Sequence, residues 1–219
     1  MSEVTFIKGK EASLEQSISY MQGILQQQGI QIQQANGLNP VENIYSLHIY
    51  DRACPGLFTN GKGASEKATL ASALGEYLER LSTNYFFSDY YLQPALKNQQ
   101  AWLYYPHEKT FSAADFRACL TPALWSLYDP HQEWLAEHLY SFNDDEPLIR
   151  ALPLRDTSSN KTVYFPMNLL SNLYASNGLS AGNTAEEAYV QGLSEIFERW
   201  VKNKILRENL CLPEVPEAV

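Results

Sequence analysis

The sequence has 219 residues, of which 45% are hydrophobic and 19% are charged, and its formal net charge at pH 7 is −9. This composition is that of a globular protein with a hydrophobic core, because a disordered chain has fewer apolar residues and a higher charge density. The acidic balance excludes non-specific binding to nucleic acid or to an anionic membrane surface, since both require a basic face.

The cysteines and the N-terminus predict the cellular compartment. Cys54, Cys119 and Cys211 lie far apart, without a Cys-x-x-Cys pair or a neighbouring histidine. This spacing indicates neither a disulfide framework nor a zinc site. Met1 to Lys10 contain no apolar signal core, and no stretch approaches the ~18 continuous apolar residues of a membrane span. We therefore expect a cytoplasmic protein with no membrane partner.

The first part of the chain predicts a helix followed by strands. From Glu11 to about Gln28, apolar residues recur at steps of three and four, which is typical of an amphipathic helix, and Gly29 ends it. Residues 30–34 and 44–50 then alternate between apolar and polar side chains, as half-buried strands do.

A long helix is predicted next. Leu57 to Thr59 favour a short strand, and the Asn60-Gly61 pair that follows is typical of a turn. Ser65 is suited to cap a helix, and no helix breaker interrupts the sequence after it. We expect this helix to run from Ser65 to about Phe87.

The second half of the chain predicts irregular structure, a hairpin and another long helix. Residues 89–145 are aromatic and rich in proline, which indicates short helices and loops. Residues 148–154 and 162–166 flank a polar tip and favour a hairpin. A helix follows from about Thr184, capped by Asn183 or Thr184, to about Glu208, after which prolines exclude a helix. The predicted fold class is α+β, with the strands forming a mixed or antiparallel sheet.

The two long helices repeat one pattern. Each follows an Asn-Gly pair and small residues, and each contains Glu-x-x-Glu-Arg, which suggests two pseudo-symmetric halves of one unit. Residues three or four apart share a helix face, so two helices lying side by side would gather four carboxylates. The residues concerned are Glu76, Glu79 and Arg80 in the first helix and Glu195, Glu198 and Arg199 in the second.

This pattern predicts a magnesium and phosphate site, with a plain alternative. Magnesium prefers oxygen ligands and bridges carboxylates to substrate phosphates, and the arginines would hold phosphate in bidentate fashion. The alternative is a solvated face with intrahelical ion pairs, which is the usual role of Glu-x-x-Glu-Arg in a single copy. The chain has no Walker-type phosphate loop, because neither Gly61-Lys62-Gly63 nor Ser180 to Asn183 matches it.

At these residues the sequence resembles the YcaO family, and within it the stand-alone bacterial proteins linked to methylthiolation of a ribosomal protein. Residues 89–145 carry little of the likeness. The segments that carry it are Phe6 to Lys10, Leu14 to Ser17, Phe58 to Ala64, Ala71 to Phe87, Val163 to Asn168 and Ser176 to Asn203.

The resemblance implies a chemistry that residue spacing does not reveal. Proteins of this family bind Mg-ATP without a Walker loop and phosphorylate the oxygen of a peptide backbone amide, which a nucleophile then attacks. A peptide or ribosomal-protein substrate is therefore implied, together with a methylthiotransferase as partner. Phosphoryl transfer depends mainly on positioning and charge neutralisation, which a site of carboxylates and basic side chains provides.

The resemblance also implies which residues contact ATP and magnesium. The implied metal ligands are Glu76, Glu79, Glu195 and Glu198, and no residue is indicated as a catalytic base. The implied nucleotide contacts are Lys10, Ser17, Ser72, Ser180, Asn183, Glu187, Gln191 and Arg199.

The length of the chain qualifies these expectations. Stand-alone members of the family are considerably longer, so we interpret residues 1–219 as the N-terminal portion of a YcaO ATP-binding domain. We expect such a portion to be inactive alone and to associate through its exposed helix faces, for example as a homodimer. Two other functions remain open: a non-catalytic protein that binds nucleotide or peptide to assist a separate modifying enzyme, and a structural α+β domain with surface ion pairs.

Overall fold

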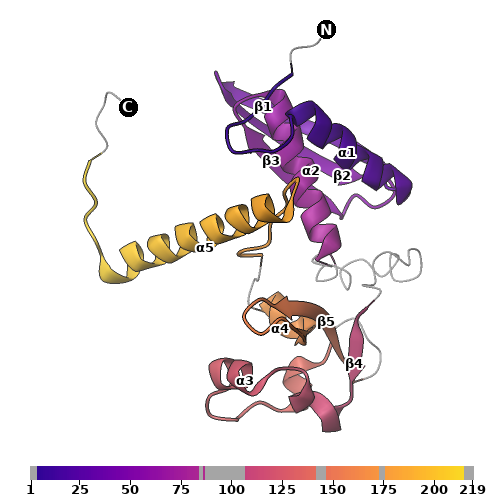
Figure 1. The fold of residues 1–219 in the computed structure, drawn as a ribbon, viewed down its shortest axis with the longest axis vertical. Coiled ribbons are helices and arrows are strands. Elements are labelled where there is room, and N and C mark those ends of the chain that lie inside the picture. Colours follow the sequence, from indigo (N-terminus) through magenta and orange to yellow (C-terminus); the bar gives the residue numbers. More distant parts are fainter. Residues whose placement is uncertain (1–3, 84–85, 87–106, 142–146, 173–175, 215–219) are drawn as a thin grey trace.

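The computed structural model describes residues 4–83, 86, 107–141, 147–172 and 176–214. These residues form two three-stranded antiparallel sheets, each with its own hydrophobic core, together with helices that include one long projecting helix (Figure 1). The α+β class predicted from the sequence is confirmed, with the strands divided between two sheets.

The first helix, α1 (Leu14–Gln27), begins directly after its N-cap residue, Ser13. The Ser13 side chain accepts a hydrogen bond from the Gln16 backbone N–H, and the Gln16 side chain accepts one from the Ser13 N–H, which is a capping box. The helix therefore starts three residues after the predicted Glu11. It ends at the expected place, because Gly29 takes a φ of +76°, which glycine adopts at little cost.

The first sheet has the order β1-β2-β3. Its strands β1 (Ile32–Val41) and β2 (Ile44–Asp51) pair antiparallel from Ile32 opposite Asp51 to Val41 opposite Ile44. Both strands were predicted, but β1 continues seven residues beyond the predicted end at Gln34. Two shifts of register let it pass Asn36, which has a φ of +52°.

The predicted turn at Asn60-Gly61 is wrong, because both residues lie inside β3 (Phe58–Gly63). Gly61 instead permits a close approach to α2 (Glu66–Ser82). A Cβ atom at Gly61 would stand 2.1 Å from the Thr69 carbonyl oxygen and 2.7 Å from the Ala73 nitrogen. Gly61 is therefore required because β3 packs closely on α2. A turn signal read from neighbouring residues does not reveal this contact.

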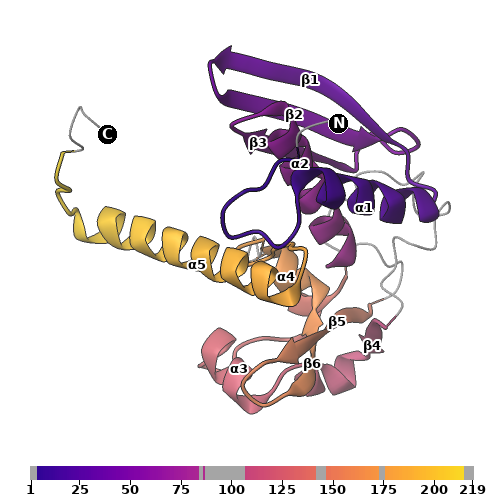
Figure 2. The ribbon, with the colours of Figure 1, turned by 45° about the horizontal axis from the view of Figure 1, so that its top comes forward.

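Helix α2 covers the inner face of this sheet, beside α1 (Figure 2). The Ser65 hydroxyl accepts a hydrogen bond from the Ala68 backbone N–H, which confirms the predicted cap. The helix ends at Ser82, five residues before the predicted Phe87. Its buried side chains join α1 and the sheet in one core, and those on α2 are Thr69, Ala73, Leu74 and Tyr77.

The second sheet has the order β4-β5-β6. The predicted hairpin is confirmed by β5 (Ile149–Asp156) and β6 (Lys161–Pro166), whereas β4 (Lys109–Phe111) was not predicted. Helices α3 (Pro122–Tyr128) and α4 (Met167–Asn172), with 3₁₀ turns at Ala113–Ala118 and Ala136–Leu139, complete this part of the chain. The predicted short helices and loops are thus found in 107–141, while 89–106 and 142–145 lie outside the described residues.

The last helix, α5 (Ala185–Glu208), is capped by the Thr184 hydroxyl, which accepts a hydrogen bond from the Glu187 N–H. Only Glu187 and Gly192 are buried along its 24 residues. Figures 1 and 2 both show α5 leaving the body after its first turns. The predicted approach of α2 and α5 is limited to the part of α5 nearest the body, because the rest of the helix projects away from it.

Two further expectations concern cysteines and membrane spans. Cys54 and Cys119 are buried free thiols, and Cys211 is an exposed one. Among the residues that the structure describes, no helix combines the length and the apolarity that crossing a bilayer requires.

Gly61→Ala is expected to destabilise the first sheet by about 1–3 kcal/mol, because the added methyl group meets backbone atoms of α2 that side-chain rotation cannot move. Gly37→Ala in β1 is the matched control, since its Cβ would meet nothing closer than the Leu47 Cδ1 atom at 4.0 Å. Urea unfolding measures both variants. Equal stability of the two would contradict the close packing of β3 on α2.

Candidate functional site

A cluster of polar side chains joins the N-terminal segment to the start of α5. The Ser17 hydroxyl donates a hydrogen bond to the Asn183 Oδ1 atom at 2.7 Å. The Asn183 backbone N–H and side-chain amide both donate to the Glu187 carboxylate, at 3.0 to 3.2 Å. The Lys10 Nζ atom lies 3.5 Å from the Glu187 Oε2 atom. Four of the nucleotide contacts implied by the family resemblance are therefore neighbours in space.

Glu187 is the centre of this cluster. Its side chain is only 5% exposed, and it also accepts a hydrogen bond of 2.5 Å from the Glu11 backbone N–H. Burial raises the pKa of this carboxyl group, but the hydrogen bonds from Glu11 and Asn183 and the charge of Lys10 outweigh burial and hold the pKa below its ordinary value. Glu187 is therefore ionised at neutral pH and ties together segments that are 176 residues apart.

A second cluster gathers carboxylates from α2 and α5. Arg80 pairs with both glutamates of its own helix, with its Nη2 atom 3.1 Å from Glu76 and its Nη1 atom 3.1 Å from Glu79. Burial raises the pKa of Glu79 to about 7; Arg80 opposes this, and the charges of Glu76 and Glu195 add to it. The influence of Glu195 on Glu79 shows that α5 brings its carboxylate into the neighbourhood of α2.

Glu195 is held in place by two donors. Its Oε1 atom accepts a hydrogen bond from the Arg199 Nη2 atom at 2.9 Å, and its Oε2 atom accepts one from the Gly178 backbone N–H at 3.1 Å. The Arg199–Glu195 pair repeats the i, i+4 pairing of Arg80 with Glu76. The repeat seen in the sequence therefore gives the same i, i+4 ion pair in both helices.

The loop before α5 packs against that helix through small residues. The Ser180 hydroxyl donates to the Ala188 carbonyl oxygen at 2.5 Å. A Cβ atom at Gly192 would stand 2.7 Å from the Gly178 carbonyl oxygen. Sequence reasoning missed Gly178 and Gly192 as parts of the site, although an isolated glycine inside a helical pattern is a recognised sign of close packing.

The other predicted site residues lie outside these clusters. Ser72 and Gln191 have exposed side chains on α2 and α5. Glu198 is also exposed, and it lines a shallow hollow along α5 instead of joining Glu79 and Glu195. The structure thus brings together Lys10, Ser17, Asn183 and Glu187 in one cluster, and Glu76, Glu79, Glu195 and Arg199 in a second.

The charges of the second cluster suit a divalent cation better than its present geometry does. The charges of Glu76 and Glu195 both act on the largely buried Glu79, and a cation would relieve their repulsion of that carboxylate. Within the described part of the chain, however, no group of three or more His, Cys, Asp or Glu residues is arranged to hold a metal ion. Metal binding here would require these side chains to move closer together.

Comparison with known proteins places the sequence in one family. Residues 60–219 match the family described as the YcaO cyclodehydratase, ATP- and Mg²⁺-binding. This match covers α2, both clusters' glutamates and all of α5. The chain belongs to the YcaO family.

Two curated relatives and one solved structure are similar to this YcaO chain. The Escherichia coli (strain K12) protein YcaO, named as an accessory factor of a ribosomal-protein methylthiotransferase, is 50% identical over 98% of the chain. A Haemophilus influenzae protein is 50% identical over 100% of the chain. The chain spans 38% of the length of each of these relatives.

The solved structure is a heterocyclase in complex with substrate and cofactor. It covers 88% of this chain and 28% of its own, with 17% identity and a TM-score of 0.46. The function proposed below does not rest on this likeness.

The raised pKa of Glu79 predicts how stability depends on pH. The ordinary pKa of this carboxyl group is 4.5, and the folded protein raises it to about 7. The stabilisation from its protonated form is therefore complete below pH 4.5 and is lost as the pH rises through 7. Glu79→Gln should remove this loss, so that the variant gains stability relative to the wild type between these pH values.

Urea unfolding at a series of pH values in Mg-free buffer measures this effect. Glu66→Gln, which removes an exposed carboxylate in the first turn of α2, is the control and should keep the loss of stability that Glu79 causes. If the stability of Glu79→Gln and of the wild type changed with pH in parallel, the pKa of Glu79 would not be raised in the folded protein.

Glu187→Ala is expected to release the N-terminal segment from α5. The change leaves the Glu11 and Asn183 N–H groups without their charged acceptor, and a hydrogen bond to a charged group contributes about 1.5–3 kcal/mol. Amide hydrogen exchange at Glu11 and Asn183 should accelerate by about tenfold or more. The neighbouring exposed residue provides the control variant Glu186→Ala, and unchanged protection in Glu187→Ala would refute the linking role of Glu187.

Proposed function

We propose that this chain contributes the Mg-ATP-binding part of a YcaO-type enzyme that activates peptide backbone amides by O-phosphorylation. The observation that supports it best is the meeting of three segments, the N-terminal residues 5–17, α2 and α5, at one polar junction. There a lysine, a hydroxyl and an amide lie in one cluster, and in another the charges of Glu76 and Glu195 act on the carboxylate of Glu79. The family description as ATP- and Mg²⁺-binding agrees with both clusters.

One cluster would bind the metal ion, and the other would bind the phosphates of the nucleotide. Glu76, Glu79 and Glu195 would take Mg²⁺ as oxygen ligands, and Glu198 would join them by a change of side-chain rotamer. Ionised Glu187 would keep Lys10 and the Asn183 amide at the junction, where both are donors suited to phosphate oxygens. Bound Mg-ATP would supply the phosphoryl group that makes the amide carbon open to a nucleophile.

The remaining residues of the set would orient the nucleotide. Arg199 is half-exposed and can turn from Glu195 to a phosphate oxygen once a cation neutralises that carboxylate. Ser17 holds Asn183, and Ser180 holds the loop against α5. Ser72 and Gln191, which are exposed on the same two helices, complete the proposed nucleotide contacts.

The substrate and partners of the whole protein belong to the same proposal. The E. coli relative is named as an accessory factor of a ribosomal-protein methylthiotransferase. By extension, this protein would act in the cytoplasm on a peptide or ribosomal protein, together with a methylthiotransferase. Because the chain spans 38% of that relative, turnover is expected of a longer YcaO polypeptide, and nucleotide binding is what this chain itself should show.

A second candidate function is nucleotide or peptide binding without catalysis, in support of a separate modifying enzyme. The word accessory in the name of the E. coli relative favours it. Measuring ADP release by a full-length relative, with and without ribosomal-protein peptides, separates the two functions. Peptide-stimulated release supports amide activation, whereas binding without release supports the accessory role.

Replacing Glu76 and Glu195 by glutamine should abolish the magnesium dependence of ATP binding, because the change removes one carboxylate from each helix while preserving size. Calorimetric titration of the 219-residue chain with ATP, in magnesium and in EDTA, measures this. The matched control is Glu66→Gln with Glu208→Gln, which neutralises one exposed carboxylate on each of the same helices away from the junction.

Two results would count against this assignment. If the junction variant kept its magnesium-dependent affinity, Glu76 and Glu195 would not be ligands. If the control lost affinity as strongly as the junction variant, the effect would come from net charge alone. Circular dichroism of each variant would confirm that its helices remain folded.

A further inference from the structure

The N-terminal loop, residues 5–13, has an anchor that lies outside both clusters. The carboxylate of Glu15, in the first turn of α1, accepts hydrogen bonds from the backbone N–H and from the hydroxyl of Thr5, both at 3.0 Å. The Nζ atom of Lys67, in the first turn of α2, lies 2.6 Å from the same carboxylate. One side chain therefore joins the loop, α1 and α2.

Three donors converge on the carboxylate of Glu15, and together they make it a stronger anchor than an exposed ion pair. The side chains of Glu15 and Lys67 are 30% and 48% exposed, and a pair at such a surface contributes little when its partners meet nothing else. Here the hydrogen bond from Lys67, and next that from the Thr5 N–H, lower the pKa of Glu15 from 4.5 to about 2. The carboxylate is therefore charged at neutral pH and keeps all three donors.

The loop is closed at its base and bent at its tip. The Thr5 carbonyl oxygen accepts a hydrogen bond from the Leu14 N–H at 2.9 Å, which closes the base. Near the tip the Lys10 N–H donates to the Ile7 carbonyl oxygen at 3.0 Å, and Gly9 takes a φ of +86°, which glycine adopts at little cost. Figure 2 shows the loop as the indigo arc that precedes α1. The backbone of Lys10 is therefore part of a turn whose geometry depends on where Thr5 lies.

The loop is tied at two places to two different helices. At one place it meets α5, through the contacts of Lys10 and Glu11 with the Glu187 carboxylate. At the other, the Glu15 carboxylate ties it to α1 and, through Lys67, to α2. A short segment fixed at both ends has little conformational freedom, so Lys10 is already ordered before a ligand arrives. Such prior order lowers the entropic cost of binding.

We propose that Glu15 and Lys67 are positioning residues that hold Lys10 at the nucleotide junction. They act through the loop: when Thr5 is released, the turn at Lys10 loses its fixed end, and its ammonium group is free to leave Glu187. The effect on nucleotide affinity rests on the ATP-binding function proposed above, in which Lys10 contacts phosphate. The hold on the loop is a property of the chain itself and exists without nucleotide.

Amide hydrogen exchange without nucleotide tests the hold on the loop. Glu15→Ala should accelerate exchange of the Lys10 amide by about tenfold, because the loop loses a charged acceptor at its other end. The amides of β2 are the internal reference, since a general loss of stability would accelerate them as well. Glu66→Ala, which removes an exposed carboxylate from the first turn of α2, is the control and should leave Lys10 protected. Unchanged protection of Lys10 in Glu15→Ala would overturn the proposal.

Calorimetric titration with Mg-ATP tests the consequence for binding. Lys67→Met should weaken the affinity of the chain by about fivefold, and Lys67→Arg, which keeps a charged donor, should restore most of it. Lys161→Met is the matched control, because it removes an exposed lysine from β6 in the second sheet, and it should bind as the wild type does. Equal affinity of Lys67→Met and Lys161→Met would contradict the positioning role.

A double-mutant cycle shows whether Lys67 acts through Lys10. In a Lys10→Met background, Lys67→Met should have no further effect on affinity, because the group that it positions is gone. A loss as large as in the wild-type background would mean that Lys67 contacts the nucleotide itself or only stabilises the fold, and it would overturn the proposal. Absence of Mg-ATP binding by the wild type would contradict the proposed function and not the hold on the loop, which the exchange measurement decides by itself.

Discussion

The arrangement of the proposed site depends on the contacts of one buried carboxylate, that of Glu187. It accepts hydrogen bonds from the Glu11 and Asn183 backbones and pairs with Lys10, so it fixes the N-terminal segment and the first turn of α5 in one place. A buried charge is costly unless such donors surround it. Because α1 in turn packs on α2, and both share one core with the first sheet, the same contact also determines where α5 begins relative to α2.

The position of α5 explains why negative charge accumulates beside α2. Once the first turns of α5 are fixed, Glu195 lies close enough to Glu79 to affect the pKa of that carboxyl group. Burial is the main cause of the raised pKa, and the charges of Glu76 and Glu195 add to it. A protein without a cation at this place would carry the repulsion at a cost. In the proposed magnesium site these carboxylates would serve as ligands of one cation, which agrees with the Mg²⁺-binding description of the family.

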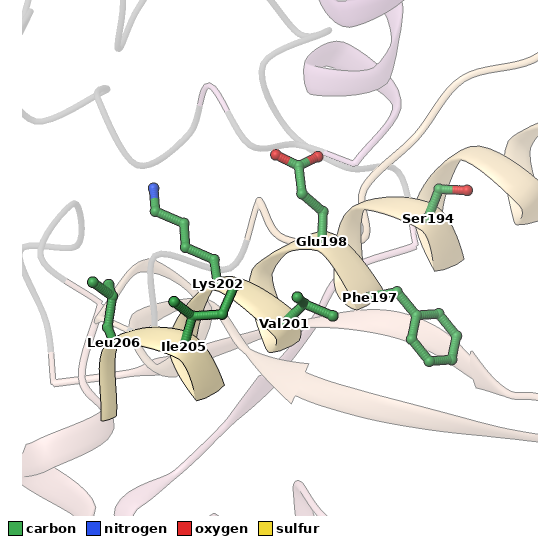
Figure 3. A pocket seen from close by; sticks show the side chains of 7 residues that line it. All are labelled: Ser194, Phe197, Glu198, Val201, Lys202, Ile205 and Leu206. Atoms are coloured by element: carbon green, nitrogen blue, oxygen red, sulfur yellow. The ribbon is translucent and has the colours of Figure 1, made fainter. Parts of the chain in front are cut away.

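The sequence predicted what local rules decide and failed where distant packing decides. Ser65 and Thr184 correctly indicated where α2 and α5 begin, because capping depends on a few neighbouring residues. Asn60-Gly61 was misread as a turn because the contact that requires Gly61 comes from α2, later in the chain. The repeated glutamates were found by pattern, but their separation depends on how α5 sits against α2, which no residue spacing encodes. Glu198 lies three residues from Glu195 and was grouped with it for that reason, but its side chain is exposed and lines the hollow along α5 (Figure 3).

Substituting Mn²⁺ for Mg²⁺ provides the most direct test of the claim that one metal-nucleotide site spans α2 and α5. Both ions accept oxygen ligands, and paramagnetic Mn²⁺ broadens the NMR signals of nearby amides. With Mn-ATP, the account predicts selective broadening around residues 76–80 and 195–199 together, and little around the hairpin of β5 and β6. Broadening of only one helix, or of neither, would contradict it.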